Sequence, residues 1–392
     1  MKSKYLLGRG FLPKELIPPF TTKGLEVHYD DILSKCNSYK YKGNAKSINL
    51  TVPRLRTSRR RLAIPNPYFQ YELCNVIEKK WSEIHSILES SKDSLSKPII
   101  NRGLRKRFLD KKSAYSEIAI RKILNSVSYK YMVYADVSRF HGTIYTHSIP
   151  WAIHGKSDSK KDNSDNLFGN TLDKFIRKSQ DGQTLGIPNG PDTSFLISEL
   201  IASRIDDDIK SRLSKSIKSF RYVDDYYFFC KTLSETEAII SQLTKALSEY
   251  ELELNPDKTK VVELPIEFEP DWVSDLRLYK FSSNQYKQRV DIVNYFSKVF
   301  SYSKEYENDF VIKYAITRIK NKKFQKENWK IYESLLLQSV LSEPSVIEVV
   351  LEIFLKYQNE GYDIRKNIIK NTLYTIFDNN IIHNNTYELL WS

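Results

Sequence analysis

The chain has 392 residues, of which 41% are hydrophobic, so it is long enough for two or three domains with sizeable cores. No run approaches the roughly 18 uninterrupted apolar residues of a membrane helix, no apolar signal segment follows Met1, and Cys36, Cys74 and Cys230 have no metal-ligand spacing. These features argue against a membrane partner, a disulfide framework and a zinc site, and they predict a cytoplasmic protein. The net charge of +13 favours a polyanionic partner. A generically lysine-rich protein would have the same charge.

The N-terminal third carries two dense basic runs. Each run joins several arginines and lysines: Arg54, Arg56, Arg59, Arg60 and Arg61 in the first, and Arg102, Arg105, Lys106, Arg107, Lys111 and Lys112 in the second. The first leads into the strand-like segment 62–65. A solvated face explains scattered lysines, but three consecutive arginines beside a strand favour phosphate contact, because the guanidinium is the better phosphate fork.

The next stretch alternates predicted helices with one strand. Apolar residues at helical spacing predict a helix from about Phe69 to Ile87. The segment Lys130–Phe140 is predicted as a strand that leads to Asp136. The polar, lysine-rich segment 157–166 is predicted to be a surface loop, and a single apolar stripe predicts a helix over 194–209.

The clearest element is a hairpin over Ser219–Cys230. Two aromatic, strand-like runs are separated only by Asp224 and Asp225, which places both carboxylates at the tip. A helix is expected to follow, opened by a capping box between Ser234 and Glu237. A further strand–turn–strand is expected around residues 255–257.

From about residue 287 the pattern changes to helix after helix. The stripe from Val346 to Tyr357 follows Pro344, and the preceding helix offers it a partner face through Trp329, Tyr332, Leu336 and Val340. Residues 285–392 are therefore expected to form a separate α-helical domain. The final residues 387–392 are apolar, which predicts that they pack back on the palm, meet another subunit or are followed by more chain; the alternative is a self-contained helical bundle that covers Trp391 internally.

The three aspartates suit phosphoryl transfer. In-line displacement at phosphorus develops charge on both the attacking and the leaving oxygen, and two divalent ions about 3.5–4 Å apart can stabilise both. Magnesium prefers hard oxygen ligands. A hairpin tip with Asp224 and Asp225 beside a strand that ends in Asp136 supplies them. Two Mg²⁺ ions are therefore the expected cofactors, with Mn²⁺ as a substitute.

An isolated Asp-Asp pair is as often a solvated turn, so the neighbouring motifs matter. Their order is a strand with Asp136, then Gly186–Gly190 opening a helix, then Tyr222–Asp225 at the hairpin, then Leu254–Thr259. These segments resemble the palm motifs of reverse transcriptases, and Arg60–Pro65 is similar to their fingers segment. The resemblance covers roughly residues 50–265.

The resemblance implies a role for each matched position. It implies catalysis by Asp136, Asp224 and Asp225, with Val137 as a further metal-binding position. The implied nucleotide-binding residues are Arg59, Arg60, Arg61, Phe140, His141, Pro188, Asn189, Gly190 and Lys258. The implied nucleic-acid-binding residues are Arg54, Arg56, Arg105, Lys106, Arg107 and Tyr222.

Three stretches more closely resemble bacterial defence-associated reverse transcriptases of the abortive-infection group: Phe11–Phe20, Ser138–Trp151 with 154–156, and Gly190–Ser194. This implies an α/β right-hand fold, with fingers and an antiparallel palm sheet, followed by an all-α helical-repeat domain in place of a thumb. The expected divisions are an N-terminal region with fingers (1–125), a palm (126–270) and the helical domain (285–392). The group is implicated in phage resistance. Its members copy a partner noncoding RNA, or make DNA without a template from a protein primer, and many are oligomers.

The expected function is therefore DNA synthesis from deoxynucleotides in antiphage defence. The expected partners are an RNA, the DNA product, and either a second copy of the chain or a defence subunit. Two positions depart from the family: His141 stands where a Phe or Tyr ring usually blocks a 2′-hydroxyl, and Asn189 stands where glutamine is usual. The alternatives are a template-independent terminal transferase and a catalytically silent, maturase-like RNA-binding scaffold. A viral RNA-dependent RNA polymerase fits less well, because those usually carry Gly-Asp-Asp at the hairpin.

Overall fold

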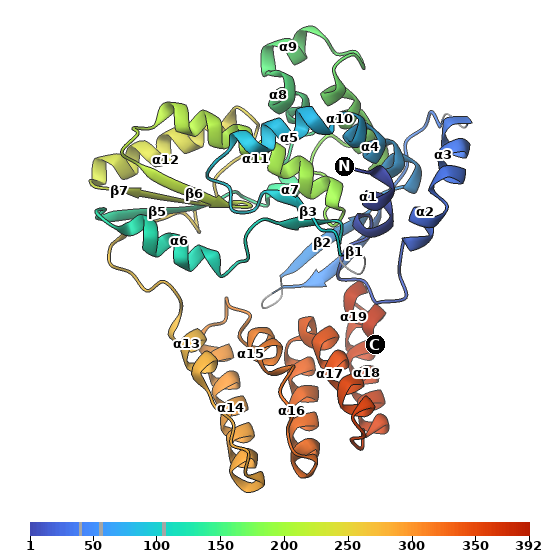
Figure 1. Cartoon of the computed structure of the whole chain (residues 1–392), viewed down its shortest axis with the longest axis vertical. Helices are drawn as coiled ribbons and strands as arrows, with labels where there is room; N and C mark the ends of the chain where they lie inside the picture. The colour runs from blue at the N-terminus through green and yellow to red at the C-terminus, as the bar shows by residue number, and fades with distance from the viewer. Residues whose placement is uncertain (39–40, 55–57, 104–106) are drawn as a thin grey trace. The chain divides into compact units, whose positions relative to one another are not determined.

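The computed structural model describes residues 1–38, 41–54, 58–103 and 107–392 (Figure 1). The chain divides into two compact units. The first comprises residues 1–14, 19–49 and 62–268, and the second comprises residues 15–18, 50–61 and 269–392. No helix in the described part of the chain is both long and apolar enough to span a membrane.

A four-stranded antiparallel sheet forms the centre of the first unit. Its strands follow the order β6–β7–β5–β8. They are β5 (Tyr131–Asp136), β6 (Lys218–Tyr222), β7 (Asp225–Cys230) and β8 (Lys260–Glu263). The strand expected over 130–140 therefore ends at Asp136; residues 137–139 form a bridge and a turn, and Phe140 begins a short helix, α7 (Phe140–Thr143). The predicted β6–β7 hairpin is confirmed.

Helices cover both faces of this sheet (Figure 1). On one face α11 (Asp192–Arg212) and α12 (Leu233–Ser248) pack over Val133, Ala135 and Phe228 in the main core. On the other face α6 (Glu117–Ser126) packs near Met132 and Phe229. Because side chains alternate along a strand, Asp136 and Asp225 share the α6 face with Met132.

The remaining elements of the first unit surround the palm sheet. The helices are α1 (Ser3–Gly10), α2 (Lys23–Val27), α3 (Tyr29–Ser38), α4 (Pro67–Lys79), α5 (Trp81–Ser90), α8 (Ser148–His154), α9 (Lys156–Lys161) and α10 (Phe168–Ser179). Short strands β3 (Pro98–Ile100) and β4 (Leu109–Lys111) pair with each other. Strands β1 (Ile48–Pro53) and β2 (Arg59–Ile64) form another two-stranded sheet, whose residues 50–61 belong to the second unit.

Three sequence-based predictions need correction. The single helix expected from about Phe69 to Ile87 is two helices, because Lys80 leaves helical geometry (φ −105°, ψ 15°) and a new helix begins at Trp81. The expected loop over 157–166 contains the short helix α9. The capping box lies two residues earlier than expected: Thr232 accepts from the Glu235 N–H, and the Glu235 carboxylate accepts from the Thr232 N–H.

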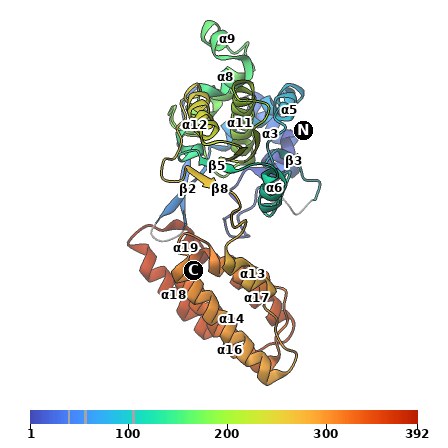
Figure 2. The same cartoon turned by 90° about the vertical axis from the view of Figure 1, so that its left-hand side faces the viewer.

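The second unit is an array of paired helices (Figure 2). They are α13 (Asp271–Leu278), α14 (Gln285–Glu305), α15 (Val311–Ile319), α16 (Trp329–Ser342), α17 (Ile347–Asn359), α18 (Lys366–Ile381) and α19 (Thr386–Trp391), with 3₁₀ turns over Lys326–Asn328 and Pro344–Val346. Helix α14 packs on α16 and α16 on α18, while α13 packs on α15 and α15 on α17.

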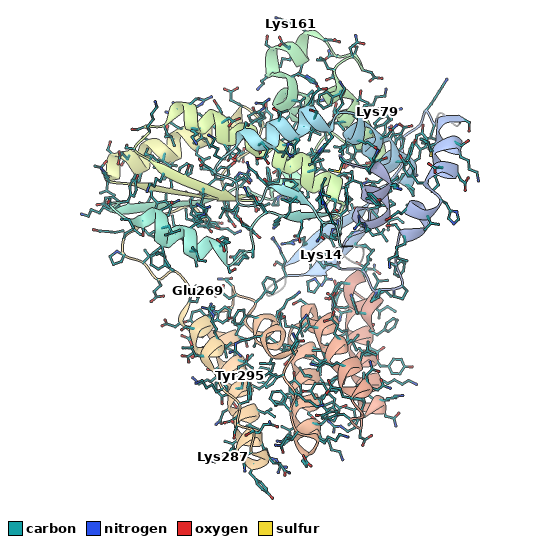
Figure 3. All side chains as sticks on the ribbon, in the orientation of Figure 1. Lys14, Lys79, Lys161, Glu269, Lys287 and Tyr295 are labelled. Carbon is teal, nitrogen blue, oxygen red and sulfur yellow. The ribbon has the colours of Figure 1, made fainter. Side chains whose placement is uncertain are left out.

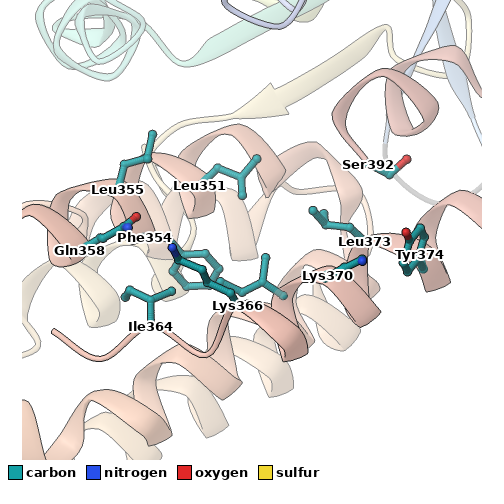
Figure 4. A pocket seen from close by; sticks show the side chains of 11 residues that line it. Leu351, Phe354, Leu355, Gln358, Ile364, Lys366, Lys370, Leu373, Tyr374 and Ser392 are labelled. Atoms are coloured by element: carbon teal, nitrogen blue, oxygen red, sulfur yellow. The ribbon is translucent and has the colours of Figure 1, made fainter.

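Aromatic side chains fill the core of this array. Tyr295, labelled in Figure 3, is fully buried, and its hydroxyl donates to the Ala315 carbonyl at 3.1 Å. Trp329 of α16 stacks on Tyr357 of α17 with ring centroids 4.5 Å apart, which confirms the predicted pairing of these helices. Between α17 and α18 lies an apolar cavity of about 600 Å³ (Figure 4), whose lining includes Leu351 and Tyr374.

Candidate active site

The β5–β7 pairing brings three carboxylates to one edge of the palm sheet. Asp136 is the last residue of β5 and lies directly opposite Asp225, the first residue of β7. Asp224 occupies the two-residue turn before β7, and its carbonyl accepts from the Val137 N–H at 3.2 Å. The strand alternation of 131–136 and the short turn at 223–224 thus place the carboxylates as the sequence predicts.

Asp224 and Asp225 lie in an unfavourable electrostatic setting. Burial, followed by the charge of Asp136, raises the pKa of Asp224. Burial, followed by the charge of Asp224, raises the pKa of Asp225 to about 6, although a hydrogen bond from the Tyr134 hydroxyl (2.6 Å) opposes the shift. Adjacent carboxylates with raised pKa values are typical of sites that receive a positive charge.

Two neighbouring side chains hold Asp136. The Lys258 ammonium lies 3.0 Å from its Oδ2, and the Asn255 amide donates to its Oδ1 at 3.3 Å. Asp136 is 5% exposed, whereas the Lys258 side chain is 53% exposed. Lys258, expected to bind nucleotide, therefore pairs with Asp136 here, and its exposure leaves it able to turn outward.

The residues at this edge fit divalent ions in donor chemistry. Three carboxylates offer only hard oxygen donors, as magnesium requires. Within the described ranges, however, no three His, Cys, Asp or Glu side chains are arranged as a ready metal site. Two of the three carboxylates have protein partners: the Lys258 ammonium donates to Asp136, and the Tyr134 hydroxyl donates to Asp225.

The glycine-rich segment is fixed next to His141. Gly186 has φ +81°, and a Cβ there would lie 3.0 Å from the Gly142 carbonyl oxygen; at Gly190 (φ +132°) it would lie 2.6 Å from Pro13. These approaches require glycine. The Ile187 N–H donates to the His141 carbonyl at 2.9 Å, so His141 and the segment 186–190, with the expected residues Pro188 and Asn189, lie together.

Two of the residues expected to contact ligands, Phe140 and Tyr222, are buried in the protein. Phe140 is 3% exposed and packs in the main core. Tyr222 is 8% exposed and lies beneath the Lys111 ammonium, which is 4.6 Å from its ring centroid. Neither environment supports the direct ligand contact expected of these two residues.

Arg107 is also held by the protein itself. Its guanidinium donates to Asp192 Oδ1 (2.7 Å), the Leu12 carbonyl (2.7 Å) and the Gly190 carbonyl (2.8 Å). It therefore clamps the end of the glycine-rich segment, and the nucleic-acid role expected of it stays a prediction. Arg56, Arg105 and Lys106 lie outside the described residues, and Arg54 is exposed.

The three fingers arginines differ in their environment. Arg59 donates from Nη1 to Glu388 Oε1 at 2.8 Å and from Nε to Thr51 Oγ1 at 3.0 Å. Its guanidinium is thus engaged within the protein, so the nucleotide contact expected of it is not supported. Arg60 and Arg61 are both exposed on β2.

A buried ion network behind the hairpin was not foreseen from the sequence. Arg221, only 1% exposed, pairs with Glu199 at 3.0 Å and with Asp206 at 2.9 Å. Arg221, three residues before Asp224, could have indicated this network, since strand alternation places its side chain on the face covered by α11 and α12. Its partners Glu199 and Asp206, however, lie apart along α11 and belong to no sequence motif.

The comparisons with known proteins agree with this geometry at the level of a domain. Residues 105–269 match the family model described as reverse transcriptase (RNA-dependent DNA polymerase). A search of the curated proteins finds no relative of the sequence.

Similar solved structures include two yeast telomerases. Apo telomerase from Candida tropicalis is 12% identical, with a TM-score of 0.43, over 91% of this chain and 73% of that one. Telomerase from Candida albicans, in complex with a fragment of telomeric RNA, is 11% identical, with a TM-score of 0.39, over 90% and 69%. These low scores carry no functional argument; the assignment depends on the family match, the antiparallel palm sheet and the carboxylate hairpin.

Proposed function

We propose that this chain, an RNA-directed DNA polymerase whose residues 105–269 form a reverse transcriptase domain, joins deoxynucleotides at Asp136, Asp224 and Asp225. The observation that carries the proposal is the direct register of Asp136 with Asp225, with Asp224 in the adjoining turn. These side chains, with Val137 beside them, would hold two Mg²⁺ ions or, in substitution, Mn²⁺. When bound, such ions lower the pKa of the attacking hydroxyl and neutralise charge on the leaving diphosphate.

The surrounding residues would bind and orient the nucleotide. Lys258, which screens Asp136, is exposed enough to turn toward a triphosphate. His141 would lie beneath the sugar, held by its main-chain bond to Ile187. Asn189 and Gly190 would line the same pocket, with the glycine allowing close approach of a ligand to the main chain. Arg60 is our candidate for the triphosphate contact.

The proposed domain boundaries follow the sequence resemblance. The fingers and N-terminal region would comprise residues 1–125, the palm 126–270 and the helical domain 285–392. The proposed template is RNA, bound through the basic surface of a chain with a net charge of +13. The resemblance to the abortive-infection group supports a role in antiphage defence in the bacterial cytoplasm, with a second copy of the chain or a defence subunit as partner.

Replacing Asp224 and Asp225 together by Ala tests the polymerase proposal. The double variant should lose deoxynucleotide incorporation while retaining its thermal stability, because the change removes two half-buried, mutually repelling charges. Asp158→Ala, which removes an exposed acid on α9, is the control and should leave incorporation unchanged. Incorporation that persists in the double variant would disprove the assignment.

Adding or omitting RNA in the same assay separates templated synthesis from terminal transfer. The defence role is tested by challenging bacteria that express either the intact chain or the double variant with phages. We expect plaque formation to fall only with the intact chain. Equal plaque formation across a broad phage panel would contradict the defence role and leave the enzymatic proposal intact.

A further inference from the structure

The hairpin that carries the catalytic aspartates contains an unfavourable backbone conformation. Val223, directly before Asp224, has φ +59°. This left-handed region suits glycine or asparagine, and it is especially unfavourable for a β-branched side chain. Such a conformation persists only where the surroundings impose it, and it is found disproportionately at functional sites.

Two buried side chains hold both main-chain polar groups of Val223. Its N–H donates to Ser96 Oγ at 2.7 Å, and its carbonyl accepts from Arg221 Nη1 at 2.8 Å. Ser96 is fully buried and Arg221 is 1% exposed. Hydrogen bonds in such a dry environment define the turn more strictly than solvent would.

Both of these side chains are anchored on one carboxylate. Ser96 Oγ donates to Glu199 Oε1 at 2.7 Å, and Arg221 Nη1 donates to the same oxygen at 3.0 Å. Glu199 is fully buried on α11. Asp206, two turns further along α11, accepts from Arg221 Nε at 2.9 Å and fixes the other side of the guanidinium. The turn is thereby tied to the rigid helix behind the sheet.

Ser94 provides an internal comparison. It is 4% exposed, and its Oγ donates to Glu199 Oε2 at 3.0 Å, so it shares the burial and the anchor of Ser96. No hydrogen bond joins it to Val223 among the contacts of the described residues. The two serines therefore differ in whether they reach the catalytic turn.

We propose that Arg221, Ser96 and Glu199 form a positioning clamp that imposes the left-handed conformation of Val223 and so aims Asp224 and Asp225. The clamp residues touch neither substrate nor metal and act through the Val223 main chain. The inference rests on the proposed function of the aspartates. Because displacement of reacting groups by about 1 Å can cost 10²-fold in rate, a turn that relaxes toward negative φ should lose turnover before it loses stability.

Ser96→Ala and Ser94→Ala form the matched test. Each removes one buried hydroxyl and one bond to Glu199, and Ser96→Ala also removes the bond from the Val223 N–H, so both should lower the melting temperature, Ser96→Ala somewhat more. Only Ser96→Ala should lower kcat, by about tenfold or more, with the KM for dTTP on poly(rA)·oligo(dT) changed by less than about twofold. Equal kcat values for the two variants would overturn the proposal.

Arg221→Lys is the second variant. Lysine keeps the positive charge beside Glu199 and Asp206 but lacks a fork that can also reach the Val223 carbonyl. It should reproduce the kcat loss of Ser96→Ala while remaining folded, as judged by circular dichroism. Wild-type kcat in Arg221→Lys would contradict the clamp.

Mn²⁺ binding provides a readout that does not depend on turnover. Titration followed by electron paramagnetic resonance should show about tenfold or more weaker Mn²⁺ binding in Ser96→Ala than in Ser94→Ala, because the former no longer aims the carboxylates. If the wild-type chain binds Mn²⁺ but incorporates no nucleotide, the proposed function fails, and this titration alone then decides on the clamp. Identical Mn²⁺ affinities in the two serine variants would overturn it.

Discussion

At the residue scale, Asp225 carries a charge that its surroundings disfavour. Its folded-state pKa of about 6 lies above the ordinary value of 3.8, chiefly through burial and the charge of Asp224. Ionisation of Asp225 therefore opposes folding. Its stabilising contribution is complete below about pH 4 and is lost as the pH rises through about 6. A bound divalent cation would reverse the effect by favouring the ionised form.

Asp225→Asn should make this visible. In metal-free buffer the variant should melt about 5 °C above the wild-type chain at pH 8, and the difference should vanish toward pH 4. Added Mg²⁺ should raise the wild-type melting temperature but not that of the variant. Calorimetry at several pH values measures both effects. A difference in melting temperature that does not change with pH would show that ionisation of Asp225 does not destabilise the fold.

His141 stands where the reverse transcriptases that this sequence resembles usually have Phe or Tyr. Its main chain is fixed by Ile187, and its neighbour Phe140 is committed to the core, so His141 is the better candidate for the sugar contact. Imidazole is smaller than a phenol ring, so exclusion of the 2′-hydroxyl should be looser. His141→Tyr should lower the ratio of ribonucleotide to deoxynucleotide incorporation, and His141→Ala should raise it. An unchanged ratio in both variants would assign the gate to another residue.

At the element scale, strongly periodic segments were predictable and helix ends were not. The β6–β7 hairpin and the helix over 194–209 followed from alternation and from a single apolar stripe. The break at Lys80 could not be read from the sequence, because the apolar stripe continues across it. The sequence offers two Ser/Thr–Glu pairs for the capping box, one beginning at Thr232 and one at Ser234. Because β7 ends at Cys230 and the helix begins at Leu233, the pair at Thr232 forms the box.

Within the candidate site, too, some residues could be predicted from the sequence and others could not. Asp136, Asp224 and Asp225 stand in local motifs, so their positions were predictable from the sequence. Glu199, whose partner Arg221 lies 22 residues further along the chain, carries no local signal. The contacts of Arg107 with Asp192 and Gly190 could not be predicted either, because these partners come from a distant segment.

Strand β2 leads to a prediction about its arginines. Arg60→Ala should raise the KM for deoxynucleotide about tenfold or more, because a charge-assisted hydrogen bond contributes about 1.5–3 kcal/mol, while RNA affinity changes little. Arg59→Ala is the matched control on the same strand. Since Arg59 is engaged by Glu388 and Thr51, its loss should lower the melting temperature and change the KM less. A larger KM change in Arg59→Ala would reverse the two roles.

At the scale of the whole molecule, the second unit is assembled from distant parts of the chain. Residues 15–18 and 50–61 join the C-terminal helices in one compact unit. The Thr51 N–H donates to Thr386 Oγ1 at 2.7 Å, and the Trp391 indole N–H donates to the Glu15 carbonyl at 3.1 Å. These contacts lie inside the second unit, where Trp391 reaches Glu15, and are not the contacts with the palm that one reading of the apolar segment 387–392 predicted.

The ion pair between Arg59 and Glu388 is the strongest of these connections. Its closest distance is 2.6 Å, and the Glu388 side chain is 2% exposed while that of Arg59 is 24% exposed. Removing one partner of a buried pair leaves an uncompensated charge, which costs about 3–5 kcal/mol when both are fully buried. Because Arg59 retains some solvent, the loss in Glu388→Ala should be about 2–4 kcal/mol.

Calorimetry should therefore show a lower melting temperature for the helical unit in Glu388→Ala. The double variant Arg59→Met/Glu388→Leu should recover much of the loss, because apolar side chains of similar length satisfy the site without desolvating a charge. Neither change touches Asp136, Asp224 or Asp225, so nucleotide incorporation below the melting transition should remain. A Glu388→Ala variant as stable as the wild-type chain would show that α19 does not hold residues 50–61 through this pair, and the recovery expected of the double variant would lose its basis.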